Sequence, residues 1–204
     1  LADGSQRPLD LTQLSLLISE TCKDLSEVKH ELILQETLRN LYDGMPILEI
    51  DKALIISART LVEQDPNYTY ATARFLLRTL YTEALDFLEL PTAVYTNNHA
   101  GVYHHYFQHY IKRGVALELL DPQLRSFDLE KLGKALLPER DQQFTYLSLQ
   151  TLYDRYFLHA DDVRFELPQA FFMRIAMGLG QQESNKEDRA IEFYQLLSSF
   201  DYVA

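Results

Sequence analysis

The spacing of the apolar residues constrains this chain most, because they recur at intervals of three and four along one segment after another. Such spacing puts side chains on one face of an α-helix and predicts that this face is buried. In the first half we expect helices over about residues 12–25, 27–42, 47–61 and 68–90. Their in-phase residues are Leu14, Leu17, Ile18, Cys22 and Leu25; Leu34, Leu38 and Leu41; Ile47, Ile50, Leu54, Ala58 and Leu61; and Ala73, Leu76, Leu77, Leu80, Ala84 and Phe87.

Breaks and caps separate these helices. Asp10 or Thr12 could cap the first helix, and Asp65-Pro66-Asn67 ends the third. Further helices are predicted for "VYHHYFQHYIKRG" (102–114), "DLEKLGKALL" (128–137), "QQFTYLSLQTLYDRYFL" (142–158, with aromatic residues on its buried side), "LPQAFFMRIAMGLG" (167–180, with Pro168 in the first turn) and "NKEDRAIEFYQLLSSF" (185–200). Small hairpins are predicted for "LADGSQRPLDL" (1–11), turning at Asp3-Gly4, and for "HADDVRFEL" (159–167). The expected fold is mainly α: a helical bundle with a small β-hairpin cap, followed by a second helical unit.

Composition excludes several classes of function. The net charge of −11, from 30 acidic and 19 basic residues, argues against a nucleic-acid partner, which would need clustered Lys and Arg. No apolar run approaches the length of a membrane span and no signal peptide opens the chain, so we expect a cytoplasmic protein without a membrane partner. A single cysteine, Cys22, excludes an internal disulfide, a cysteine-rich metal cage and dithiol chemistry within these residues.

Three histidines fall within six positions, at His104, His105 and His109. His105 and His109 are spaced to bind one zinc ion, but Tyr106 stands where a metalloprotease helix would carry its glutamate. No cysteine lies nearby as a further ligand. The face opposite is apolar and contains Tyr103, Tyr106, Phe107, Tyr110 and Ile111. We therefore favour a solvated helix face over a metal site.

Other candidate motifs have simpler explanations. "LADGS" lacks the glycines and the Lys-Ser/Thr of a phosphate loop, and "GLGQQ" (178–182) suits a helix C-cap. The acidic pairs Asp161-Asp162 and Glu187-Asp188 fall in a polar turn and a first helical turn, where solvation explains them. The aromatic residues fall mostly on apolar faces and are expected in the core. The residues alone therefore predict no catalytic, cofactor-binding or metal-binding site.

Several stretches resemble the large subunit of class I ribonucleotide reductase. "RDQQFTYLSLQTLYDRYFL" (140–158) with "FELPQAFFMRIAMGL" (165–179) looks like the helix pair before that family's catalytic barrel, and "EFYQLLSSF" (192–200) like the helix that leads into it. "LADGS", "LDLTQLSLLISE", "LYDG" and "DPNYTYATARFLL" look like an ATP-cone, the family's small regulatory domain. The resemblance implies three parts: a cone-like domain (1–90), a connector helix (91–117) and the N-terminal helical part of the catalytic domain (118–204).

The resemblance implies a function that these residues would serve only as part of a longer protein. The family reduces ribonucleoside diphosphates to deoxyribonucleotides for DNA synthesis, by thiyl-radical chemistry that needs a separate small subunit. Its catalytic cysteines and substrate pocket belong to the barrel and C-terminal tail, and Cys22 matches none of them. We expect a fragment that is inactive alone, has no cofactor of its own, and belongs to an oligomeric enzyme whose allosteric effectors are ATP and dATP. The implied partners are the small subunit and other large subunits.

The cone-like part departs from the family's nucleotide-binding pattern. Leu1 and Ala2 stand where the family has Lys and Arg, although Asp3 and Gly4 keep the turn. The remaining departures are Arg7 for Glu, Asp10 and Gln13 for Asn and Lys, Asp51 for His, and Thr82 for Lys. Each lost charge-assisted contact removes about 1.5–3 kcal/mol. We therefore expect a degenerate cone that serves as a spacer or interface. Some members of the family carry such a copy beside an intact cone, and the resemblance leaves open whether one precedes Leu1.

Two alternatives remain open at this point. The chain could be an autonomous all-helical protein-interaction module, or a metal-binding protein that uses the histidines at 104–109.

Overall fold

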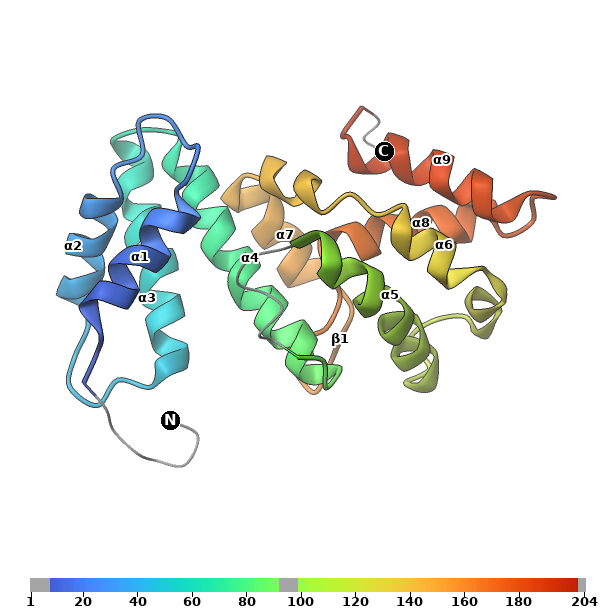
Figure 1. The fold of residues 1–204 in the computed structure, drawn as a ribbon, viewed down its shortest axis with the longest axis horizontal. Coiled ribbons are helices and arrows are strands. Elements are labelled where there is room, and N and C mark those ends of the chain that lie inside the picture. The colour runs from blue at the N-terminus through green and yellow to red at the C-terminus, as the bar shows by residue number, and fades with distance from the viewer. Residues whose placement is uncertain (1–7, 92–98, 202–204) are drawn as a thin grey trace. The chain divides into compact units, whose positions relative to one another are not determined.

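The computed structural model describes residues 8–91 and 99–201, and these are mainly helical, as predicted (Figure 1). The elements are α1 (Leu11–Thr21), α2 (His30–Asn40), α3 (Ile47–Thr60), η1 (Leu61–Glu63), α4 (Tyr68–Phe87), α5 (His99–Ala116), η3 (Pro122–Ser126), α6 (Leu129–Lys134), η4 (Pro138–Gln143), α7 (Tyr146–Arg155), β1 (His159–Ala160), β2 (Val163–Arg164), α8 (Pro168–Gly180) and α9 (Lys186–Ser198). The predicted turn at Asp3-Gly4 lies outside the described residues. Within them, no helix is both long and apolar enough to cross a membrane.

The chain divides into two compact units. The first contains residues 1–79 and 144–152, and the second contains residues 80–143 and 153–204, so α4 and α7 contribute to both. In the first unit α1, α2 and α3, drawn blue to cyan in Figure 1, pack as neighbours around a core with the N-terminal part of α4. That core includes Leu14, Ile18, Ile33, Leu54, Ala58 and Phe75. Asp10 caps α1, as predicted, because its carboxylate accepts the N–H groups of Thr12 and Gln13, both at 3.0 Å.

The predicted buried face of α2 was wrong at one position, since Leu34 and Leu41 are partly buried against the core. Leu38 is 40% exposed, whereas Ile33 and Thr37 are completely buried. Thr37 can occupy the core because its hydroxyl donates a hydrogen bond to the Ile33 carbonyl at 2.7 Å, which satisfies the polar atom within the helix. A prediction from the spacing of leucine and isoleucine alone does not include a buried threonine.

The prediction for residues 142–158 also needs correction. The helix α7 is shorter, and the side chain that it buries fully is Leu149 rather than an aromatic one. The buried aromatic residues Phe144 and Phe157 lie in the segments before and after it. Thr145 sets the start of α7, because its hydroxyl accepts from the Ser148 N–H and its carbonyl accepts from the Ser148 hydroxyl.

The helices α8 and α9 pack closely against each other in the second unit. Pro168 begins α8, as predicted. The C-cap explanation for the glycines at the end of α8 was wrong, because the capping residue is Gln181 and Gly180 still belongs to the helix. A Cβ at Gly180 would lie 3.3 Å from both the Ala190 nitrogen and the Lys186 oxygen, so glycine allows the two helices to approach.

The predicted hairpin in the second half is confirmed. The strands β1 and β2 are antiparallel, with His159 opposite Arg164 and Ala160 opposite Val163. Asp161 and Asp162 form the two-residue turn, with φ values of 50° and 62°. Two positive φ values are what a type I′ hairpin turn requires. Both side chains are exposed, in agreement with a solvated polar turn.

Candidate functional site

The histidine-rich helix α5 has the two faces that the sequence predicted. Tyr103, Tyr106, Phe107, Tyr110 and Ile111 are all buried. His105 and His109 are exposed, and the Nδ1 of His109 donates to the His105 carbonyl at 2.8 Å along the helix. In the described parts of the chain, no group of three or more His, Cys, Asp or Glu side chains could hold a metal ion.

The buried tyrosines of α5 do more than pack, which the sequence did not reveal. The Tyr106 hydroxyl donates to the Phe165 carbonyl at 2.6 Å and accepts from the Leu167 N–H at 2.9 Å. The Tyr103 hydroxyl accepts from the Gln169 N–H at 3.1 Å. These bonds hold residues 165–167, which link the hairpin to α8, and the first turn of α8 against α5. The sequence signal was hydroxyl-bearing rings, rather than phenylalanines, at positions 103, 106 and 110 of the apolar face.

Tyr110 bonds to the same link at Glu166, a buried carboxylate that also forms an ion pair with the partly exposed Arg174. The Tyr110 hydroxyl donates to Glu166, which has no exposed surface. Arg174 donates to Glu166 from Nε at 2.7 Å and from Nη2 at 3.2 Å, and the Leu158 N–H donates at 2.9 Å. Burial acts to lower the pKa of Arg174, but the hydrogen bond and charge of Glu166 outweigh it and raise that pKa. Because its oxygens are committed to these partners, Glu166 is a structural anchor rather than a free acid or base.

Asp141 is the second buried carboxylate among the described residues of this unit, and its three hydrogen-bond donors are uncharged. Its Oδ2 accepts from the hydroxyls of Tyr81 at 2.6 Å and Tyr103 at 2.8 Å, and its Oδ1 accepts from the Gln169 Nε2 at 2.7 Å. Burial raises the pKa of Asp141 to about 6, against the opposing effect of these three hydrogen bonds. Gln169 in turn accepts from the Tyr194 hydroxyl at 2.7 Å, which connects η4 through α8 to α9.

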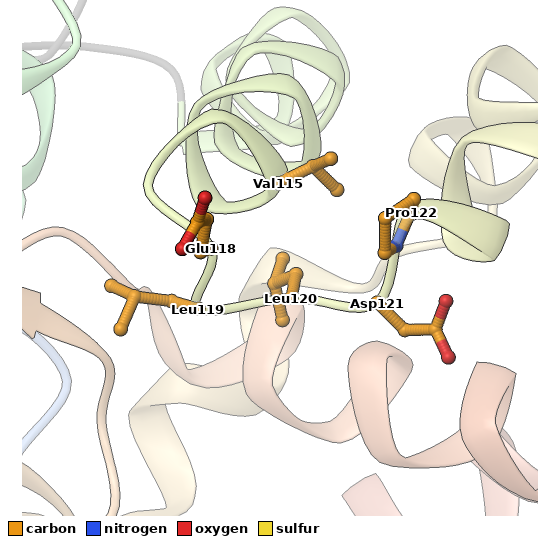
Figure 2. Close-up of a pocket in the computed structure, with 6 residues that line it drawn as sticks. All are labelled: Val115, Glu118, Leu119, Leu120, Asp121 and Pro122. Carbon is orange, nitrogen blue, oxygen red and sulfur yellow. The ribbon is translucent and has the colours of Figure 1, made fainter.

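Two surface hollows lie in the second unit. One, of about 580 Å³, is lined by Val115, Glu118, Leu119, Leu120, Asp121 and Pro122 (Figure 2). Figure 2 shows the carboxylates of Glu118 and Asp121 at opposite ends of this hollow, so they do not form an acid–base pair. Asp121 also accepts from the Gln123 N–H at 2.8 Å as the cap of η3.

The other hollow has a volume of about 320 Å³, and three of its lining side chains, His109, Lys112 and Arg113, contain nitrogen. Its residues are Phe87, Leu88, Glu89, His109, Lys112, Arg113 and Ala116. Part of the histidine-rich stretch therefore borders a hollow, which the sequence did not indicate.

Two of the described positions that differ from the ATP-cone pattern, Asp10 and Asp51, have structural partners. Asp10 caps α1, and Gln13 is exposed on the same helix. Asp51 on α3 pairs with Arg78, with 3.6 Å between Oδ1 and Nε, and burial raises the pKa of Asp51 despite this partner. Thr82 is exposed on α4. Leu1, Ala2, Asp3, Gly4 and Arg7 lie outside the described residues.

Cys22 is the one thiol of the sequence. It is buried, and burial raises its pKa to about 11, with Arg74 opposing this effect. A nucleophilic thiol needs an accessible sulfur and a lowered pKa. Cys22 therefore belongs to the core of the first unit.

Comparison with known proteins agrees with the resemblance seen in the sequence. Residues 142–204 match the family model described as "Ribonucleotide reductase, all-alpha domain". The chain is 38% identical over 203 residues to the ribonucleoside-diphosphate reductase subunit alpha of Chlamydia muridarum, covering 98% of this chain and 19% of that protein. It is 33% identical to the same subunit of Helicobacter pylori, again over 98% of this chain and 24% of that protein. The large subunit of vaccinia virus is 27% identical over 81% of this chain and 20% of its own length. The chain thus spans about a fifth to a quarter of these relatives.

Proposed function

We propose that this chain, which matches the N-terminal region of the ribonucleotide reductase large subunit over nearly its whole length, is the regulatory and structural N-terminal portion of such a subunit. The parent enzyme would reduce ribonucleoside diphosphates in the cytoplasm, with a radical-generating small subunit as its partner. The observation that carries this proposal is similarity over 98% of the chain to proteins of which it covers only 19–24%. The catalytic residues would then lie outside these 204 residues, which alone should be inactive.

The coding sequence on both sides of this stretch tests the proposal. We expect an open reading frame that continues beyond residue 204 into a cysteine-containing catalytic domain. The longer protein, mixed with its small subunit, should reduce ribonucleoside diphosphates, whereas the 204-residue chain in the same assay should not. A stop codon directly after residue 204 would favour the autonomous interaction module instead.

Within this portion we propose a cone-like domain at residues 1–90, a connector helix at 91–117 and the start of the catalytic domain at 118–204. The match of residues 142–204 to the all-alpha family model supports the last part. The four helices that share one core in residues 8–79 support the first. The bonds from the tyrosines of α5 to residues 165–169 support a connector that is anchored to the catalytic side.

The cone-like domain should not bind ATP or dATP, which would act on the parent enzyme elsewhere. Phosphate recognition needs cations and free N–H groups. Instead, two of the substituted positions carry carboxylates, and both are committed: Asp10 caps α1 and Asp51 pairs with Arg78. The remaining role is contact with other subunits. Exposed apolar side chains on α2, on α3 and between them are compatible with this role; they are Leu38, Tyr42, Ile47 and Ile56.

A test of subunit contact uses the longer protein. Replacing Ile56 by Asp should weaken the association of large subunits in sedimentation velocity, because it puts a charge on an exposed apolar position of α3. Replacing Gln13 by Asp, at an exposed position of α1, adds the same single negative charge and is the control. Unchanged association of the Ile56→Asp variant would contradict an interface on α3.

A further inference from the structure

The outer face of α5 is unusual for an acidic chain. The protein has a net charge of −11, yet residues 99–116 contain no Asp or Glu. The exposed or partly exposed positions in the second half of this helix include His109, Lys112 and Arg113. All three line the 320 Å³ hollow next to the C-terminal turn of α4. Positive charge is therefore gathered where the surface is concave.

Two of the three nitrogen-bearing side chains of this hollow, Arg113 and His109, are oriented by contacts that leave N–H or ring-nitrogen positions free. The Arg113 guanidinium lies over the Phe87 ring, 5.2 Å from its centroid, and Phe87 itself stacks on Phe165 with 4.9 Å between centroids. Cation–π contact of this kind orients the guanidinium but leaves its N–H groups free to donate. His109 uses Nδ1 for the His105 carbonyl, so its Nε2 remains for a ligand. Among the described residues, Lys112 and Arg113 have no carboxylate within ion-pair distance.

Two features work against an anion here, although the lining contains two cations and one carboxylate. Glu89 contributes one carboxylate to the lining. The hollow also lies near the C-terminal ends of α4 and α5, where exposed carbonyls carry partial negative charge and cations are common. Those carbonyls are already bonded: the Leu90 N–H donates to Leu85 at 2.9 Å, and the Leu117 N–H donates to Arg113 at 3.0 Å. Lys112 and Arg113 are therefore not needed as hydrogen-bond donors to these two carbonyls.

We propose that the hollow bordered by His109, Lys112 and Arg113 binds a small phosphate-bearing anion. Lys112 and Arg113 supply the charge and the N–H donors, and the ring of His109 supplies a third contact one helical turn away. A volume of about 320 Å³ is at the lower end for small-molecule sites and suits a phosphate or diphosphate group. None of the residues that line this hollow is one of the positions that differ from the ATP-cone pattern. A negative result for the hollow therefore leaves the proposed function unchanged, and the reverse also holds.

The test is a titration of the 204-residue chain with pyrophosphate, followed by amide chemical shifts at constant ionic strength. Sodium chloride adjusts the ionic strength because exposed charges are screened by added salt. We expect saturable shifts at residues 87–89 and 109–116. Replacing Lys112 or Arg113 by Gln should weaken binding about three- to tenfold each. Replacing Glu89 by Gln should strengthen it about two- to fivefold, because it removes the opposing charge.

The matched control is Arg125→Gln, which removes an exposed arginine of the same unit that does not line the hollow. It should leave the pyrophosphate affinity unchanged. A purely structural effect of the other substitutions would not produce the gain expected for Glu89→Gln. Shifts that do not saturate, that sodium chloride reproduces, or that Lys112→Gln and Arg113→Gln leave unaltered would overturn the proposal. A parallel titration with inorganic phosphate shows whether one phosphate group is sufficient or a diphosphate is preferred.

Discussion

Replacing Asp141 by Asn should remove a pH-dependent part of the free energy of unfolding. Asp141 is fully buried, and its pKa rises from 3.8 to about 6 in the folded protein. Because this carboxyl binds its proton more tightly in the folded than in the unfolded state, its contribution to stability is fully present below pH 4 and is lost as the pH rises through 6. A shift of this size corresponds to about 3 kcal/mol. Asn does not titrate, and its single oxygen at the Oδ2 position can accept from both tyrosine hydroxyls.

The assay is urea unfolding followed by circular dichroism between pH 4 and pH 7.5. The unfolding free energy of the variant minus that of the wild type should rise by about 3 kcal/mol across this range, then stay constant above pH 7. Asp161→Asn, at the exposed hairpin turn, is the matched control for removing a carboxylate from the surface. A difference that is flat with pH would refute the reasoning. A difference that falls with rising pH would mean that the three hydrogen bonds outweigh burial.

Three further predictions follow from the described contacts. Tyr106→Phe should lower the free energy of unfolding by about 2–4 kcal/mol in urea titrations, because it leaves a buried carbonyl and a buried N–H without partners; a loss below 0.5 kcal/mol, on the order of an exposed substitution, would contradict this. Gly180→Ala should cost about 1–3 kcal/mol in the same assay, since its Cβ meets α9 backbone at 3.3 Å, whereas Gly178→Ala, with nothing within 4 Å, should be neutral or slightly stabilising. Cys22 should react with a thiol reagent at pH 8 only as fast as the protein unfolds, because burial raises its pKa to about 11; rapid labelling of the native protein would show that the thiol is accessible.

The apolar periodicity predicted most helices because burial of one face is a local property of the sequence. The cap at Asp10, the first-turn Pro168 and the turn at Asp161-Asp162 were also predictable, because each depends only on residues that are neighbours in the sequence. The burial of Thr37 on α2 was not predictable, because this side chain enters the core only with its hydroxyl bonded to the helix backbone. Local pattern cannot show that a polar side chain has found such a partner.

The buried network around α5 depends on partners far away in the sequence. The acceptor of the Tyr106 hydroxyl lies 59 residues later, and that of the Tyr81 hydroxyl lies 60 residues later. The sequence showed tyrosines on an apolar face, but their hydroxyl partners are fixed only by tertiary packing. Gly180 was misread for a similar reason, since its close neighbour is another helix.

The measurement that tests the central claim most directly is calorimetric titration of the 204-residue chain with ATP and dATP. The account predicts no saturable heat at micromolar nucleotide, because the cone-like positions carry committed carboxylates at Asp10 and Asp51. Weak binding that disappears in a Lys112→Gln, Arg113→Gln double variant would belong to the hollow on α5 and leave the claim intact. Micromolar binding that persists in this variant would contradict it, and would show that the cone-like domain still recognises nucleotides.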